Sequence, residues 1–221
     1  MGLKIRGLIF DMDGLMIDTE RWLHRYWCQA AREYGFPLQM EDVLQIRSLS
    51  AELASAKLKL ILGDTFDYDT VKARRKQLMA EHVEKCGVEE KKGLGVLLDY
   101  AKAHGYKLAV ATATDLERTT QYLTSIGKIA YFDTLVCGGM VTHGKPAPDI
   151  YLEAARQLGL PPEECVALED SPNGILSAFR AGCKPIMVPD LDEPDQETRK
   201  RLFGLATDLE QVIDLLKQKG E

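Results

Sequence analysis

The stretch LIFDMDGLMIDT, residues 8–19, decides the fold of this chain. An apolar run led by Ile5 continues into it and breaks at Asp11, Asp13 and Gly14, which is the pattern of a buried parallel strand followed by a sharp turn. Ligands of open α/β sheets bind beyond the carboxyl ends of the strands. The stretch therefore predicts a functional site at Asp11 and Asp13.

Asp11 and Asp13 would repel each other if both were ionised, which either raises the pKa of one of them or calls for a nearby cation. Mg²⁺ suits this spacing because it prefers oxygen ligands and takes only one or two protein carboxylates besides a substrate phosphate. A solvated Asp-x-Asp-Gly turn is the alternative for an isolated motif. The residues downstream decide against that alternative.

Composition bounds the class of protein. The 221 residues are 45% hydrophobic and 28% charged, which predicts a globular chain of one domain plus an insertion, or two small domains. A formal net charge of -6 argues against nucleic-acid and anionic-membrane binding. Five singly spaced cysteines favour reduced thiols, so we expect a cytoplasmic protein. The apolar run before Asp11 is too short for a signal peptide or a membrane span, so we expect neither.

Helix and strand signals divide the rest of the chain into two parts. Up to residue 87 only helices are predicted, at 19–34, 43–46, 51–62 and 69–86. From residue 93 strands and helices alternate. The predicted strands are 107–111, 134–137, 165–168 and 185–188, and the predicted helices are 93–104, 116–126, 149–158, 173–181 and 208–217. This alternation predicts an α/β fold, a Rossmann-like parallel sheet covered by helices.

The first strand, residues 5–10, is too short to form a domain and must join the later sheet. We therefore expect an α/β core made of residues 1–16 and 88–221, interrupted by a helical-bundle cap at 17–87. A cap inserted at this point would overhang the strand ends. It is a candidate lid that excludes water and selects the substrate.

Residues after the predicted strand 107–111 suit phosphate binding. A hydroxyl from Thr112 and backbone N–H groups at Ala113, just before a helix, form a natural phosphate cradle. Capping of that helix by Thr114 or Asp115 is an equally good interpretation of the same residues.

Two further motifs follow along the chain. Lys145 stands in a loop stiffened by two prolines, which favours a clamp for a phosphoryl group over a solvated surface charge. Glu169 and Asp170 end the predicted strand 165–168 and are either a helix-capping pair or part of an oxygen-ligand magnesium site. We prefer the magnesium site because Asp11 and Asp13 end another strand of the same sheet.

These motifs together resemble the haloacid dehalogenase superfamily, in its branch of small phosphatases and β-phosphoglucomutases with a helical cap after the first motif. The resemblance covers essentially the whole chain, because all four family motifs occur in order. They are Asp11-Met12-Asp13-Gly14 with Asp18-Thr19, then Thr112, then Lys145-Pro146, then Glu169-Asp170-Ser171 with Gly174.

The resemblance implies a role for each carboxylate. Asp11 would be the nucleophile that forms an aspartyl-phosphate, and Asp13 the general acid that protonates the leaving oxygen and then activates water. Mg²⁺ would be held by the Asp11 carboxylate, the Asp13 backbone carbonyl and the Asp170 carboxylate, with Glu169 bound directly or through water.

The resemblance also implies that Thr112, Ala113 and Lys145 hold the phosphoryl oxygens of the substrate. Dehalogenases of the superfamily lack an acid at the place of Asp13. The acid at this position therefore favours phosphoryl transfer over carbon–halogen cleavage.

Cap residues bear on the choice between a hydrolase and a mutase. β-Phosphoglucomutases have a cap histidine that aligns with Leu23, whereas this chain has His24, and they have an arginine and a glycine where this chain has Arg47-Ser48. Arg47 is either a contact for a substrate anion or a surface arginine, and the same choice applies to the basic residues 74–76.

We therefore expect a magnesium-dependent phosphatase that hydrolyses a small phosphate monoester, such as a sugar or related metabolite phosphate. The alternatives are a β-phosphoglucomutase-type mutase and a non-catalytic binding protein of the same fold, the latter disfavoured because Asp11, Asp13, Lys145 and Asp170 are all present. The expected partner is a small phosphorylated metabolite, not nucleic acid or a membrane, and the expected state is a monomer or small homo-oligomer.

Overall fold

A six-stranded parallel sheet forms the centre of the structure, a computed structural model that describes residues 4–47, 49–191 and 193–219. The strand order is β3-β2-β1-β4-β5-β6, with every neighbouring pair parallel. The strands are β1 (Gly7–Phe10), β2 (Lys107–Ala111), β3 (Thr134–Val136), β4 (Cys165–Glu169), β5 (Lys184–Met187) and β6 (Gly204–Leu205). The predicted α/β parallel sheet is confirmed.

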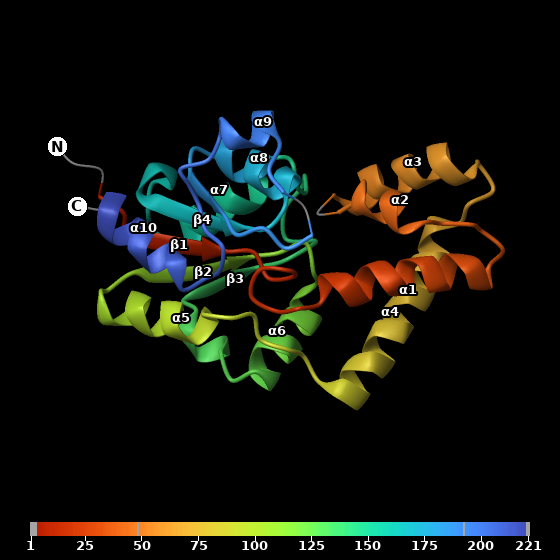
Figure 1. The fold of residues 1–221 in the computed structure, drawn as a ribbon, viewed down its shortest axis with the longest axis horizontal. Coiled ribbons are helices and arrows are strands. Elements are labelled where there is room, and N and C mark those ends of the chain that lie inside the picture. Colours follow the sequence, from red (N-terminus) through yellow and green to blue (C-terminus); the bar gives the residue numbers. More distant parts are fainter. Residues whose placement is uncertain (1–3, 48, 192, 220–221) are drawn as a thin grey trace.

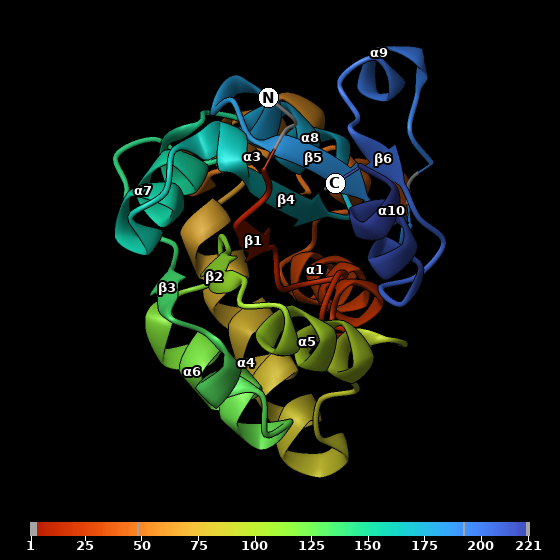
Figure 2. The same ribbon diagram turned by 90° about the vertical axis from the view of Figure 1, so that its left-hand side faces the viewer.

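Helices cover both faces of the sheet, which explains why its strands are apolar on both sides (Figure 2). Along β1, Leu8 and Phe10 pack on one face and Ile9 on the other. The first face is covered by α5 (Leu94–Ala103), α6 (Leu116–Ser125) and α10 (Gln211–Lys219). The second face is covered by α7 (Asp149–Leu158) and α8 (Pro172–Arg180).

Residues 20–86 form a helical unit beside the sheet (Figure 1). Its helices are α1 (Glu20–Glu33), α2 (Met40–Leu44), α3 (Ala51–Leu62) and α4 (Tyr68–Cys86). The side chains of Ser50 and Asp67 cap α3 and α4. The unit has a buried apolar cluster of its own, which includes Trp27, Ala30, Leu58, Phe66 and Val71. Separate packing of this kind lets the unit keep its shape at the strand ends.

Most predicted elements lie within a few residues of the observed ones, and the short elements are where the prediction failed. The helix α9 (Gln196–Arg199) and the two-residue strand β6 carry too few residues to show a period in the sequence. The last helix begins at Gln211 rather than at residue 208, because Asp208 caps it by accepting a hydrogen bond from the Gln211 N–H at 3.0 Å. None of the helices in the described ranges is long and apolar enough to cross a membrane.

Candidate active site

Three neighbouring strands bring the predicted site residues to one edge of the sheet. β1 lies between β2 and β4, and all three run in the same direction. Asp11 directly follows β1, Thr112 follows β2, and Glu169 and Asp170 stand at the end of β4. The carboxyl ends of parallel strands meet at one edge, so residues more than 150 positions apart become neighbours.

Lys145 lies at the centre of this edge, with 1% of its side chain exposed. Its Nζ lies 2.5 Å from Asp11 Oδ1 and 2.6 Å from Glu169 Oε1, and it donates to the Ala111 carbonyl oxygen at 3.0 Å. Burial alone would lower the pKa of Lys145, but the two carboxylates outweigh burial and raise it. Lys145 is therefore a fixed cation against the carboxylate of Asp11.

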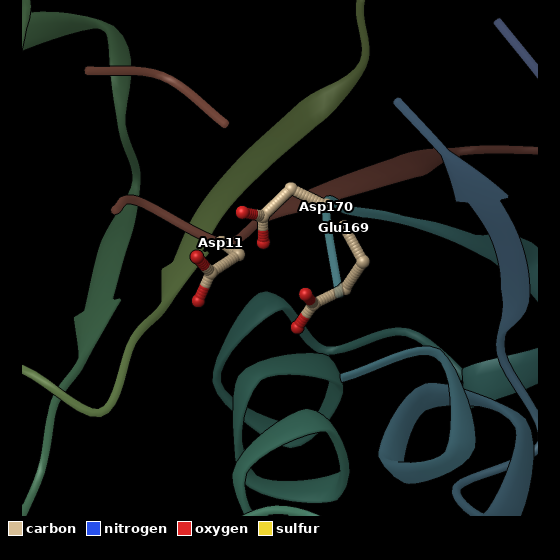
Figure 3. A group of neighbouring side chains, drawn as sticks. All are labelled: Asp11, Glu169 and Asp170. Carbon is tan, nitrogen blue, oxygen red and sulfur yellow. The ribbon is translucent and has the colours of Figure 1, made fainter. Parts of the chain in front are cut away.

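The carboxylates of Asp11, Glu169 and Asp170 form a buried acidic cluster (Figure 3). One oxygen of each lies within 4.8 Å of the other two. Asp170 Oδ1 is buried and has no hydrogen-bond partner among the described residues. Three oxygen donors, one of them orphaned, match the ligand set that Mg²⁺ prefers. The cluster therefore fits the predicted metal.

Two glycines let the acidic residues approach the backbone. A Cβ placed on Gly14, which has a φ of +86°, would lie 2.1 Å from Asp170 Oδ2. A Cβ on Gly174 would lie 2.0 Å from the Glu169 carboxyl carbon. A larger residue at either position would push a carboxylate out of the cluster, which explains why both motifs carry glycine.

Burial raises the pKa of Asp11 to about 8, although Lys145 pulls it in the opposite direction. The carboxylates of Glu169 and Asp13 add to the rise. Burial also raises the pKa of Asp170 well above its usual value, against the opposing charge of Arg47. The acidic cluster is therefore short of positive charge, which is the condition that a bound divalent cation relieves.

Asp13 lies beside the cluster and has other partners. Thr19 Oγ1 donates to Asp13 Oδ1 at 2.5 Å, and Thr114 Oγ1 donates to Asp13 Oδ2 at 2.7 Å. Burial raises the pKa of Asp13 and the two hydroxyl hydrogen bonds oppose the rise. A raised pKa keeps the carboxyl group protonated to higher pH, which is the form a general acid needs. Thr19 occupies the N-cap position of α1, but its hydroxyl donates to Asp13 and makes no capping bond.

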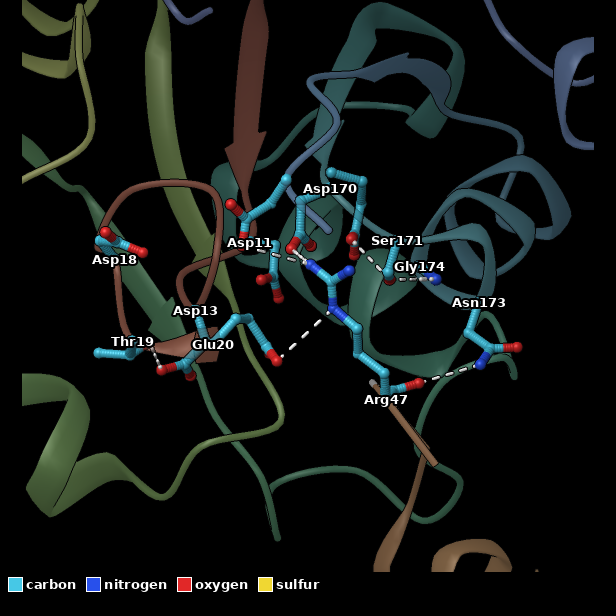
Figure 4. Close-up of polar contacts among 12 residues, drawn as sticks. Asp11, Asp13, Asp18, Thr19, Glu20, Arg47, Asp170, Ser171, Asn173 and Gly174 are labelled. Carbon is cyan, nitrogen blue, oxygen red and sulfur yellow. Dashed lines mark hydrogen bonds and ion pairs between the residues drawn. The ribbon is translucent and has the colours of Figure 1, made fainter. Parts of the chain in front are cut away.

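Arg47, in the loop between α2 and α3, is 5% exposed, so its interpretation as a surface arginine is wrong. Its guanidinium contacts the Asp170 carboxylate and lies 3.6 Å from Glu20 Oε2 and 3.8 Å from Asp190 Oδ2 (Figure 4). Asn173 Nδ2 donates to the Arg47 carbonyl at 3.0 Å. Arg47 thus ties the helical unit to the acidic cluster. The neighbouring Ser48 lies outside the described residues.

Glu20 was not predicted as a site residue, and His24 was considered only as a displaced mutase histidine. His24 Nε2 lies 3.0 Å from Glu20 Oε2, and both residues are buried beside the acidic cluster. Burial opposes ionisation of Glu20, but His24 and Arg47 outweigh it and lower the pKa of Glu20. The spacing of four residues between Glu20 and His24 on one helix could have indicated this pair in the sequence.

A cavity of about 410 Å³ opens between the strand ends and the helical unit. Asp11, Asp13, Thr112, Ala113 and Lys145 line its core side. Cavities of this volume accept small metabolites. The opposite wall comes from the helical unit, and its lining includes Leu23, Trp27, Arg47, Tyr68, Lys72 and Arg75.

Paired aspartates, a buried lysine and an acidic pair meet at one edge of the sheet, and this arrangement can be compared with known families. Residues 8–188 match the family model of the haloacid dehalogenase-like hydrolases. The chain is 32% identical to the phosphorylated carbohydrates phosphatase of Thermotoga maritima over 221 residues, which cover 97% of this chain and 99% of that protein. The chain therefore belongs to the haloacid dehalogenase-like hydrolases and is an enzyme of their phosphatase class.

Two further comparisons support the family and the fold, respectively. The fructose-1-phosphate phosphatase YqaB of Escherichia coli is 32% identical over 191 residues, which cover 84% of this chain and 97% of that protein. The crystal structure of β-phosphoglucomutase from Clostridium difficile superposes with a TM-score of 0.84 and covers 98% of this chain and 97% of its own, at 19% identity. The structural similarity confirms the fold alone, because a sequence identity of 19% does not support a shared activity.

Proposed function

We propose that this protein is a magnesium-dependent phosphatase that hydrolyses a small phosphate monoester, a sugar or related metabolite phosphate, through an aspartyl-phosphate on Asp11. The observation that carries the proposal is the buried contact of Lys145 with Asp11 at 2.5 Å, with Asp13 two residues away on the same cavity wall. Lys145 opposes the rise in the pKa of Asp11 and so favours the ionised carboxylate that can attack phosphorus, and a neighbouring carboxyl group of raised pKa can supply the proton.

In the first half of the reaction the Asp11 carboxylate attacks phosphorus, and the bond from phosphorus to the substrate oxygen breaks. Asp13 gives its proton to the departing oxygen, so the product leaves as an alcohol. In the second half the Asp13 carboxylate takes a proton from water as the water oxygen attacks phosphorus, and the bond from phosphorus to the Asp11 oxygen breaks. Inorganic phosphate leaves, Asp11 is again a carboxylate, and Asp13 again carries its proton.

The other residues at the strand ends position these groups. Thr112 and Lys145 are placed to hold phosphoryl oxygens, and the backbone at Ala113 lines the same cavity. Glu169 accepts from Lys145 at 2.6 Å and from the Tyr151 hydroxyl at 2.5 Å, so it fixes the lysine besides any contact with metal. The Lys145 ammonium neutralises charge on the transferring group.

The Asp11 and Asp170 carboxylates and the Asp13 backbone carbonyl would hold Mg²⁺, with Glu169 as a direct or water-mediated partner. When bound, the metal neutralises charge on the phosphoryl group. The orphaned oxygen of Asp170 supports this ligand set.

We propose that residues 17–87 act as the cap over a core of residues 1–16 and 88–221. The separate apolar cluster of the helical unit supports this division, as does its contribution of one whole cavity wall. The names of the Thermotoga and Escherichia relatives support a phosphorylated carbohydrate as substrate. The five free cysteines support a cytoplasmic location.

The test is phosphate release from a panel of sugar and metabolite phosphates, with Mg²⁺ and with a chelator. We expect release that depends on Mg²⁺ and is lost in the Asp11→Asn variant. β-Glucose 1-phosphate with its bisphosphate activator is included in the panel. Conversion of that compound to glucose 6-phosphate without free phosphate would overturn hydrolysis in favour of a mutase.

A further inference from the structure

A group of cations lines the cavity, three from the cap wall and one from the core helix α6. Lys72, Arg75 and Lys76 come from α4 and Arg118 from α6, and all four line the cavity. One acid serves two of them: Asp115 Oδ2 lies 3.3 Å from Lys76 Nζ and 3.1 Å from an Arg118 nitrogen. Within the described ranges Lys72 and Arg75 have no ion pair, and the carboxylates of Asp13 and Glu20 act on Arg75 only from a distance.

Arg75 is the most deeply placed member of the group. The residue is 9% exposed, and its Nε has no hydrogen-bond partner in the described part of the chain. Its guanidinium lies 5.3 Å from the centre of the Trp27 ring, which covers one face of the fork and leaves its edge for another partner. Burial and the neighbouring charge of Arg118 lower the pKa of Arg75. A buried guanidinium without an anion is costly, which points to a ligand that supplies one.

Lys72 adds a second cation to the same place. It is half-buried, and its Nζ lies 5.4 Å from the centre of the Tyr68 ring. Burial lowers the pKa of Lys72, and Lys76 and Arg75 lower it further. Mutual repulsion between these side chains is relieved when an anion binds between them. Trp27 and Tyr68 supply the apolar surface beside the two cations.

This wall is separate from the residues that hold the transferring phosphoryl group. Lys145 and Thr112 belong to the core side, where Lys145 also contacts Asp11, Glu169 and the Ala111 carbonyl. We propose that Arg75 and Lys72 bind a second anionic group of the substrate, a carboxylate or a phosphate, so that the preferred substrate is anionic at both ends. This inference rests on the proposed phosphatase function. The planar fork of arginine suits either anion through two parallel hydrogen bonds.

The test compares phosphate esters that differ only at the far end. 6-Phosphogluconate carries a carboxylate where glucitol 6-phosphate carries a hydroxyl, and glucose 1,6-bisphosphate carries a second phosphate that glucose 6-phosphate lacks. We expect kcat/KM at least about tenfold higher for one or both compounds that carry an anion at each end, which corresponds to about 1.4 kcal/mol of recognition. The pair that shows the preference identifies the anion as carboxylate or phosphate.

Variants assign that preference to the cap wall. Arg75→Gln should reduce the ratio of kcat/KM between the two members of a pair to about one, and Arg75→Lys should keep part of it. Lys72→Gln, at a half-buried position, should lower the ratio even where Arg75→Gln fails to fold. The matched control is Arg74→Gln, because Arg74 lies on the same helix and pairs with Glu33 at 2.6 Å, away from the cavity lining.

Failure of this inference differs from failure of the proposed function. Phosphate release at equal rates from both members of each pair, or a preference that survives in Arg75→Gln and Lys72→Gln, would overturn the second-anion site alone. If no phosphate is released from any compound, the phosphatase proposal fails. Calorimetry of 6-phosphogluconate and glucitol 6-phosphate binding to Asp11→Asn then decides the inference, since equal affinities would contradict it.

Discussion

The core edge and the cap wall face each other across one cavity, and they differ in how their buried charged side chains are paired. At the core edge Lys145 meets two carboxylates within 2.6 Å, and Asp13 accepts two hydroxyl hydrogen bonds. On the cap wall Arg75 is also buried, but it has no ion pair among the described residues and its Nε has no hydrogen-bond partner there. The Lys145 ammonium is therefore paired with acids of the chain itself, whereas the Arg75 guanidinium has no paired acid in the described part of the chain.

The largest expected effect is at the nucleophile. Asp11→Asn should lower kcat roughly 10⁴-fold or more, because an amide is a poor nucleophile of nearly the same shape. Phosphate release from the best substrate of the panel measures this loss. The melting temperature serves as the control for folding. Undiminished magnesium-dependent turnover in the variant would remove Asp11 from the nucleophile's role.

The next effect is at the acid. Asp13→Asn should lower kcat/KM by about 10²–10⁴ for sugar phosphates, and by much less for p-nitrophenyl phosphate, whose leaving group needs no proton. Because burial raises the pKa of Asp13, the protonated form persists to higher pH, and kcat/KM for sugar phosphates should fall as the pH rises through that pKa. A wild-type profile without this fall, or an equal loss for both substrates, would count against Asp13 as the acid.

The stability of the core edge gives a third test. Lys145→Met should lower the free energy of unfolding by about 3–5 kcal/mol when measured with a chelator, because it leaves Asp11 and Glu169 buried without their cation. Urea unfolding followed by fluorescence measures the change. Mg²⁺ should restore part of the loss. Wild-type stability in the variant would show that the carboxylates do not depend on the lysine.

Substitution by methionine on the cap wall should stabilise the protein, and its effect on stability should be smaller than that of Lys145→Met. Arg75→Met should raise the melting temperature by about 2–4 °C, as expected for a gain of ~1 kcal/mol, because it removes a buried charge that lacks an acid. Differential scanning calorimetry of the two methionine variants gives the comparison directly. A lowered melting temperature for Arg75→Met would mean that the guanidinium contributes to folding and not only to ligand binding.

Local patterns in the sequence were sufficient to predict the core. Apolar runs that break into Asp11, Thr112 and Glu169 predict both the strands and their functional ends, because a strand is a local feature and parallel strands share one edge. The predicted helix 51–62 agrees with α3, which ends at Gly63 with a φ of +95°, and a positive φ at a helix end is also a local feature.

The cap wall was not predictable in the same way. Arg47 and Arg75 resemble surface residues in sequence, because charged side chains usually stay in water. Their burial depends on how the helical unit meets the strand ends, and no local hydrophobic period predicts a contact between residues as far apart in the chain as Arg47 and Asp170. The partnership of Glu20 with His24 was visible as a spacing on one helix, but its place beside the acidic cluster was not.

The most direct test of the central claim is to trap phosphate on Asp11. The enzyme is mixed with ³²P-labelled substrate and Mg²⁺, quenched in acid within milliseconds, and the peptide that contains residues 8–19 is isolated and analysed by mass spectrometry. The account predicts a phosphate attached to Asp11 that disappears on chase with unlabelled substrate, and no label in Asp11→Asn. Steady turnover with no labelled protein at any quench time, or label on another residue, would contradict it.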